Sequence, residues 1–275
     1  IAGGGLYTTS AGGNAVSLGG SVIGNNDSAA ITFSNSGAIT TVGSNSAAIV
    51  AQSIAGGGGA VFGLEDATAT SVTLGGENAS ENKASALNLT ITGNLTTTGN
   101  LSPALLAHSI GGGGGYAPLP SANAAAGAIN SLNLDGSTVE LNLSADVLTT
   151  GFGSDGLLIQ SIGAGGGVVG SSTSSLTMGA SNLANGDGAD VTVNSTGTIT
   201  TTGDQSIGIT AQSIGAGGGR AGTASGSVTL GGNGATGDAG NVSLNLAADG
   251  GNGSIITTGA QSPAFVLQSV GGGGG

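Results

Sequence analysis

One phrase recurs five times in this chain: a hydrophobic segment, then Gln-Ser-Ile or a close variant, then a run of glycine. The serine of the phrase recurs at intervals of 56, 52, 52 and 56 residues. A period of this length indicates a stacked array in which each repeat packs against the next. We therefore treat the chain as a single repeat array. Its repeats span 1–53, 54–109, 110–161, 162–213 and 214–269, and 270–275 begins another.

Each repeat has the same internal order of short strand patterns. After the glycine run, a first pattern alternates apolar and polar residues and ends in glycine, as in 71–76 and 131–136. A second follows a polar turn, as in 87–91, and a third carries paired threonines, as in 95–97. Alternation with period 2 over a few residues is typical of a half-buried strand. The last strand of each repeat leads back into the Gln-Ser-Ile phrase.

This order predicts an all-β fold. Glycine fills 60 of the 275 positions, and each glycine costs a helix about 1 kcal/mol relative to alanine. Sandwiches and barrels also have short strands, but they do not repeat one phrase five times. We predict a right-handed parallel β-solenoid of five 52–56-residue repeats, with equivalent residues stacked about 4.8 Å apart. Each repeat is long enough for one wide coil or two narrow ones, and we favour two.

Equivalent residues of a solenoid form columns, and two columns stand out here. The first is glutamine in four of the five repeats, and its side-chain amides could hydrogen-bond along the stack. The second is serine in every repeat. The first column is Gln52, His108, Gln160, Gln212 and Gln268. The second is Ser53, Ser109, Ser161, Ser213 and Ser269. We interpret both as structural ladders, and His108 as a member of the first.

The glycine runs recur at one phase of the repeat, beside the most apolar strand. Residues 105–107 are apolar on both faces, as expected for a strand buried on both sides. We predict that the glycine runs stack as extended, polyproline-II-like segments and cover one sheet, because glycine lets backbones approach closely. Flexible linkers are the alternative.

Composition limits the partners. The chain has 14 acidic and 2 basic residues and a net charge of −12. Nucleic-acid binding needs clustered Lys and Arg, so we exclude nucleic acid as a partner. The absence of cysteine fits a long exported chain that crosses a membrane unfolded. No apolar run is long enough to span a bilayer as a helix. Because the chain opens and closes within glycine runs, we expect a piece of a longer array, with its targeting segments elsewhere.

The segments 37–59 and 197–214 carry the phrase in its fullest form. They resemble the passenger repeats of large Gram-negative autotransporters, the type V secretion systems. The resemblance implies a β-solenoid passenger that is exported across the outer membrane and displayed on the bacterial cell surface by a C-terminal translocator barrel. This chain departs from the pattern at His108, at Val270 and in the proline-bearing turn 117–120. Passengers of this family include adhesins, self-associating proteins, enzymes and passive stalks.

Residues suited to catalysis are few and scattered. Lys83 and Arg220 lie in different repeats at different phases, and His108 is the single histidine. No Ser-His-Asp set can be assembled from them, so we predict no enzyme and no cofactor. A weak calcium candidate is Asp187 with Asp190, in a segment that resembles part of a calcium-binding β-roll repeat. The segment occurs once, and an ordinary Asx-rich turn is the alternative.

We therefore expect a non-enzymatic extracellular fibre or adhesin shaft. Its partners would be neighbouring repeats of the same chain, and beyond them other copies of the chain or host or abiotic surfaces. Adhesive contacts would come from the variable turns at 7–14, 62–70, 77–83 and 116–126. A self-assembling filament or matrix is the main alternative. An ice-binding solenoid that uses one threonine of each pair and a phage tail adhesin are less favoured.

Overall fold

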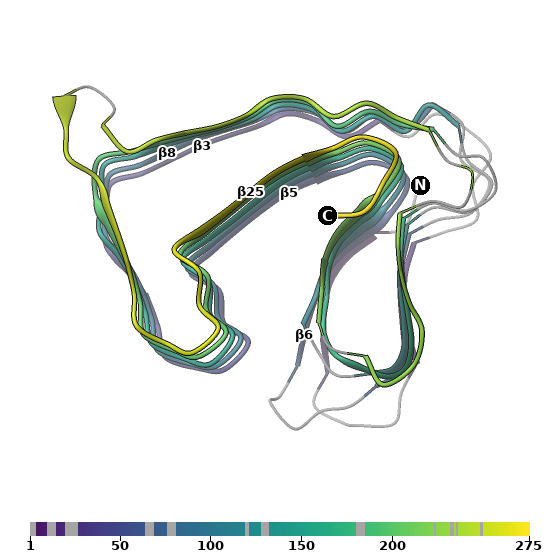
Figure 1. The fold of residues 1–275 in the computed structure, drawn as a ribbon, viewed down its shortest axis with the longest axis horizontal. Helices are drawn as coiled ribbons and strands as arrows, with labels where there is room; N and C mark the ends of the chain where they lie inside the picture. The colour runs from purple at the N-terminus through teal and green to yellow at the C-terminus, as the bar shows by residue number, and fades with distance from the viewer. Residues whose placement is uncertain are drawn as a thin grey trace.

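The protein is a parallel β-solenoid made of five parallel sheets (Figure 1), which confirms the predicted fold class. A computed structural model describes residues 4–9, 15–19, 27–63, 69–75, 81–118, 121–127, 132–179, 185–222, 224–231, 234, 236–247 and 250–275. Each sheet takes one strand from every repeat, and all neighbouring strands run parallel. We number the sheets first to fifth in the order in which the chain visits them.

The first two sheets follow the glycine run of each repeat. The first consists of β1 (Gly4–Thr9), β6 (Gly58–Gly63), β11 (Gly114–Ala117), β16 (Gly166–Val169) and β21 (Gly218–Ala221). The second consists of β2 (Ala15–Leu18), β7 (Ala69–Leu74), β12 (Ser121–Ala126), β17 (Ser172–Met178) and β22 (Val228–Leu230).

The other three sheets complete the coil. The third consists of β3 (Ile31–Asn35), β8 (Leu87–Ile91), β13 (Val139–Leu143), β18 (Val191–Ser195) and β23 (Val242–Asn245). The fourth consists of β4 (Ile39–Thr41), β9 (Leu95–Thr97), β14 (Val147–Thr149), β19 (Thr198–Thr201) and β24 (Ser254–Thr257). The fifth consists of β5 (Ile49–Ile54), β10 (Leu105–Ile110), β15 (Leu157–Ile162), β20 (Ile209–Ile214) and β25 (Phe265–Val270).

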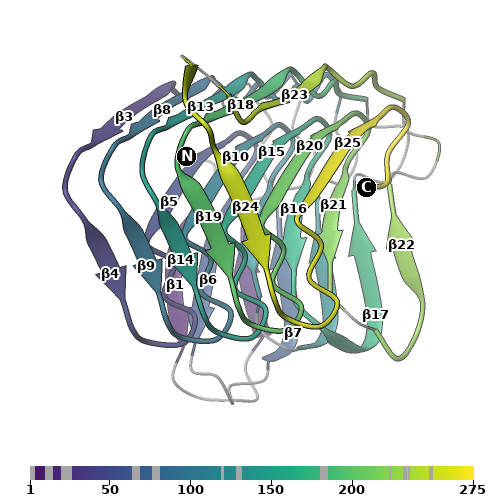
Figure 2. The same cartoon turned by 60° about the vertical axis from the view of Figure 1, so that its left-hand side comes forward.

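Each repeat forms one wide coil, so the preference for two narrow coils is wrong. Every strand pairs with the equivalent strand of the next repeat: Leu105 lies opposite Ile49 on one side and Leu157 on the other. Two coils per repeat would instead pair strands of the same repeat with each other. Figure 2 shows the successive coils side by side along the axis.

The wide coil folds back on itself into two lobes, each with its own core (Figure 1). The larger lobe is enclosed by the third, fourth and fifth sheets and is filled by aliphatic residues such as Leu89 and Leu141. The smaller lobe lies between the first and second sheets and is filled by residues such as Leu74 and Met178. Because a single coil encloses two cores, about 52 residues are needed to go round once.

The fifth sheet lies between the two lobes and is buried on both faces in its central strands. Ala107 points into the larger lobe. On the opposite face, Leu106 and Leu158 pack against Tyr116 and Val168 of the first sheet. The first sheet therefore covers the second face of the fifth, as predicted from the apolar strand.

The glycine runs supply both a tight turn and the start of the first sheet. They stack on one another through backbone hydrogen bonds, as when the Gly114 N–H donates to Gly57 O at 3.2 Å. In the run of the second repeat, φ rises from +78° at Gly56 to +142° at Gly59, so the conformation is not the polyproline-II form that we predicted. A Cβ added at Gly114 would collide with the backbone of Gly166. Glycine is required here both by φ and by the close approach of neighbouring coils.

One predicted strand is misplaced. The segment 131–136 matches the first strand pattern, but in the third repeat the strand of the second sheet is β12. There Ala124 and Ala126 lie opposite Val72 and Leu74. Residues 133–136 instead belong to no strand and lead towards the third sheet, with φ of +53° at Asn133 and Leu134 fully buried.

Candidate functional site

The glutamine column forms a buried ladder on the face of the fifth sheet that looks towards the first. Gln160 Nε2 donates to Gln212 Oε1 at 2.6 Å, and Gln212 Nε2 donates to Gln268 Oε1 at 2.5 Å. At the other end, Gln52 Nε2 lies 3.3 Å from His108 Nδ1. The column holds neighbouring coils in register through side chains as well as backbone.

His108 interrupts this ladder. His108 Nε2 and Gln160 Oε1 are both buried, and neither has a hydrogen-bond partner. Burial lowers the pKa of His108 to about 3, so the imidazole is neutral at physiological pH. With its side chain enclosed, His108 has no route to a substrate and belongs to the structural column.

The serine column joins two sheets of the larger lobe. Each hydroxyl lies beside the segment that enters the third sheet: Ser109 Oγ accepts from Ser137 N at 2.8 Å, and Ser161 Oγ accepts from Ala189 N at 2.9 Å. Ser53 and Ser213 make the same bond to Ser85 N and Gly240 N. Ser269 differs, because its Oγ donates to Gly240 O at 2.8 Å.

A second serine column, which the sequence reasoning missed, stabilises the turn between the fourth and fifth sheets. In four of its five members the Oγ atom accepts a backbone N–H of the preceding coil at 2.9–3.0 Å. The members are Ser46, Ser102, Ser154, Ser206 and Ser262. Serine at this phase of all five repeats is the signal that identifies the column.

The paired threonines divide between the inside and the outside of the larger lobe. Inner residues such as Thr97 and Thr149 donate from Oγ1 to Ser102 O and Ser154 O, in both cases at 2.6 Å. The outer file is not uniform in sequence. It consists of Thr40, Thr96, Leu148, Thr200 and Ile256. Leucine and isoleucine interrupt the threonine file that an ice-binding face would need.

The two calcium candidates, Asp187 and Asp190, accept backbone hydrogen bonds from the next coil. Asp187 Oδ1 accepts from Asp238 N at 2.8 Å, and Asp190 Oδ1 accepts from Asn241 N at 2.7 Å. Among the described residues, no group of three or more His, Cys, Asp or Glu side chains is placed to hold a metal ion.

Within the same part of the chain, no helix has the length and apolar character needed to cross a bilayer.

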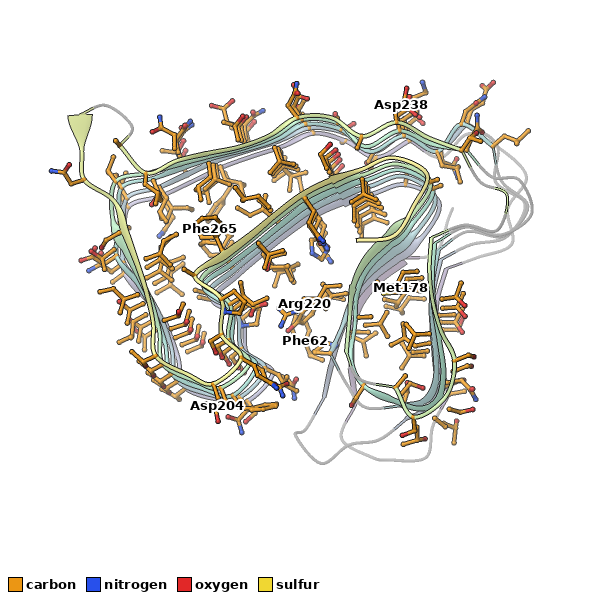
Figure 3. All side chains as sticks on the ribbon, viewed as in Figure 1. Phe62, Met178, Asp204, Arg220, Asp238 and Phe265 are labelled. Carbon is orange, nitrogen blue, oxygen red and sulfur yellow. The ribbon has the colours of Figure 1, made fainter. Side chains whose placement is uncertain are left out.

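The two basic residues sit in different surroundings. Lys83 Nζ lies 3.0 Å from Asp135 Oδ2 on an exposed face, where an ion pair adds little stability. Arg220, in β21, pairs with Asp155, in the turn between the fourth and fifth sheets; their side chains are 27% and 3% exposed. The Arg220–Asp155 pair therefore links the two lobes, and Figure 3 places Arg220 and Phe62 in the space between them.

This space is a groove of about 400 Å³, which we call the inter-lobe groove. One wall is the turn between the fourth and fifth sheets, which contributes Leu101, Phe152 and Gln205 from three successive coils. The other wall is the first sheet, with Tyr116 and Val168. Volume and composition match ligand pockets, which are mostly apolar with a few convergent polar groups.

Polar groups of the inter-lobe groove are fixed in place. Tyr116 Oη donates to Leu101 O at 3.2 Å, which gives a second link between the lobes. Asp155 Oδ1 accepts from Ile207 N at 2.8 Å, while its other oxygen meets Arg220. Burial raises the pKa of Tyr116 and lowers that of Arg220. The groove therefore presents a guanidinium, oriented by a buried carboxylate, beside apolar walls.

The sequence reasoning did not bring these residues together. It treated Arg220 as an isolated base and Tyr116 as part of the variable turn 116–126. Phe152 and Asp155 were not singled out, although each departs from its column. The residues equivalent to Phe152 are Ser44, Asn100, Asp204 and Ala260, and those equivalent to Asp155 are Ala47, Pro103, Ile207 and Pro263. A column-by-column comparison of this turn would have found both.

Of the other variable turns, 62–70 reaches the inter-lobe groove through Phe62, whose ring lies 5.7 Å from that of Tyr116. Residues 10–14, 64–68, 77–80 and 119–120 of the predicted adhesive segments lie outside the described residues. Comparison with family models, with curated proteins and with solved structures finds no match for this chain.

Proposed function

We propose that this chain is a non-enzymatic structural and adhesive shaft, displayed on the surface of a bacterial cell as part of a type V-secreted passenger. One observation carries the proposal: every repeat forms the same five-sided coil, and each pairs with the next through all five sheets. Such an array extends along one axis by simple repetition. A shaft needs this property.

The chemistry of the chain supports the non-enzymatic part of the proposal. His108 is enclosed and neutral, and Arg220 is engaged with Asp155. Lys83 lies on an exposed face, paired with Asp135. The three residues best suited to acid–base chemistry or charge stabilisation therefore do not share a site.

Composition and sequence resemblance support the extracellular location. The chain has no cysteine and a net charge of −12, so neither disulfide formation nor nucleic-acid affinity would interfere with export or display. The phrase in 37–59 and 197–214 resembles passenger repeats of autotransporters. The proposed partners are neighbouring repeats, other copies of the chain, and host or abiotic surfaces.

Lateral self-association into a filament or matrix is the second candidate function. Leu148 and Ile256 interrupt the outer file of the fourth sheet, and their side chains are 38% and 49% exposed. Apolar residues on a flat outer sheet face favour contact between shafts. Thr96 and Thr200 occupy the same file, so the apolar character is discontinuous and we rank this candidate second.

Immunogold electron microscopy of the source cells tests the proposal, with an antibody raised against this array. Label along single thin fibres that project from the cell would support the shaft. Label in bundles or sheets would favour the self-assembling matrix. Label confined to the cytoplasm would overturn the surface location.

A further inference from the structure

We propose that the inter-lobe groove binds a neutral carbohydrate chain. The inference goes beyond the shaft function and does not depend on surface display, because purified protein suffices to test it. It rests on the aromatic and apolar walls of the groove, on the Arg220–Asp155 pair between them, and on the way in which these residues depart from their columns.

The departures concentrate in one place although the array has many variable positions. Phe152 is 47% exposed at a turn where the other four repeats have Ser, Asn, Asp or Ala. Leu101 adopts φ of +52°, a conformation that is unfavourable for leucine and that its equivalents Asn45 and Gly153 adopt more readily. Neither residue improves the turn. Both line the inter-lobe groove, so a role in the groove explains their presence.

The polar groups define what the ligand must offer. A guanidinium carries five N–H donors, so the pairing of Arg220 with Asp155 leaves donors for other contacts. The Asp155 carboxylate is 3% exposed and engaged through both oxygens, so it orients the guanidinium and does not itself meet a ligand. The hydroxyl groups of a sugar can accept from the guanidinium donors that remain. The C–H faces of a pyranose ring match the apolar wall formed by Phe152 and Leu101.

Charge favours a neutral ligand. Arg220 and Asp155 compensate each other within the groove, and the chain as a whole carries a charge of −12, which repels anions. An acyl chain is disfavoured as well, because it would cover the ion pair without replacing the hydration that the pair loses.

An extended peptide is disfavoured by the backbone of the groove. A bound peptide needs partners for its own N–H and C=O groups. The groove's N–H groups at Leu101, Gly153 and Gly170 already donate to neighbouring coils, at 2.7–2.9 Å.

The three coils that line the turn wall span roughly 10 Å along the axis, taking one strand spacing per coil. That length accommodates about two sugar residues of a longer chain.

A printed array of neutral and acidic glycans, probed with the purified protein, tests the ligand class. Calorimetric titration with a soluble hexasaccharide of the strongest neutral glycan then gives the affinity. We expect Phe152→Ser, which restores the residue of the first repeat, to weaken binding at least tenfold. Leu148→Ala removes an exposed apolar side chain of the same coil outside the groove, and should leave the affinity unchanged.

Leu101→Asn separates binding from folding. Asparagine tolerates a positive φ better than leucine, so this variant should melt at or above the wild-type temperature and still lose affinity at least tenfold. The proposal is overturned if no neutral glycan binds, or if Phe152→Ser and Leu101→Asn bind like the wild type. Preferential binding of acidic glycans, or of a decaproline peptide titrated in parallel, would also overturn it.

Discussion

Gln160 donates a hydrogen bond to Gln212 at 2.6 Å but leaves its own Oε1 without a partner, because His108 occupies the next position of the column. An otherwise continuous ladder therefore has one defect, deep between the first and fifth sheets. A buried acceptor without a partner costs about 1–3 kcal/mol. The defect offers a direct test of how much the column contributes.

We predict that His108→Gln raises the free energy of unfolding by about 1–3 kcal/mol, because an amide can bond to both Gln52 and Gln160. Urea denaturation followed by circular dichroism measures the change. Gln212→His serves as the matched control: it places the same defect two coils further along the column and should lower stability by a similar amount. Equal stabilities of the three proteins would show that the ladder is energetically neutral.

His108 should also make the protein sensitive to acid. Its pKa is about 3 when folded and near the ordinary 6.5 when unfolded. Between these values the unfolded state binds more protons, so stability falls as the pH drops from 6.5 towards 3, by about 1.4 kcal/mol per unit. Denaturation of the wild type and of His108→Gln at pH 7 and pH 4.5 measures this slope. If both proteins lose the same stability, His108 is not the group responsible.

Removing only the Asp155 side of the link between the lobes should lower stability, whereas replacing both Asp155 and Arg220 by apolar residues should lower it little. Asp155→Ala leaves the largely buried Arg220 without its partner, so we expect a loss of about 3 kcal/mol. The double variant Asp155→Ile with Arg220→Val introduces the residues of other repeats at the same columns, Ile207 and Val168. It should recover most of that loss. Thermal melting of both variants measures the difference, and a double variant as unstable as the single one would contradict the prediction.

The stacked glycines at the start of the first sheet should tolerate no side chain. Gly114→Ala would push a methyl group into the backbone of Gly166 at a φ of +139°. We expect a loss of about 4 kcal/mol, or failure to fold. Gly37→Ala is the control, because a Cβ there meets nothing within 4 Å; it should change stability by less than about 0.5 kcal/mol. Similar melting temperatures for the two variants would disprove the close stacking.

Much of the fold could be predicted because each column repeats one residue type. The strand bounds 87–91 and 95–97 agree with β8 and β9, since alternation and flanking turns mark both strands clearly. The number of coils per repeat could not be predicted, because one wide coil and two narrow ones place the same residues in the same columns. β12 was missed because Ala124 and Ala126 have little preference for strands, whereas 131–136 alternates more clearly.

The candidate site was harder to predict for a geometric reason. Arg220 and Asp155 meet only because the coil folds back and brings the turn between the fourth and fifth sheets against the first sheet. That bend has no periodic signature in the sequence. The departures at Phe152 and Asp155 were visible in their columns, but nothing in the sequence indicated that they face Tyr116 and Arg220.

One coil per repeat also governs how the protein would respond to mechanical load. Backbone bonds between coils run along the axis, so axial tension acts on all five sheets of one boundary at once. When a boundary yields, a whole coil is released, and about 52 residues can extend to roughly 180 Å at full stretch. The array would then lengthen in near-equal steps, so that under tension it gives way one coil at a time while the remaining coils stay folded.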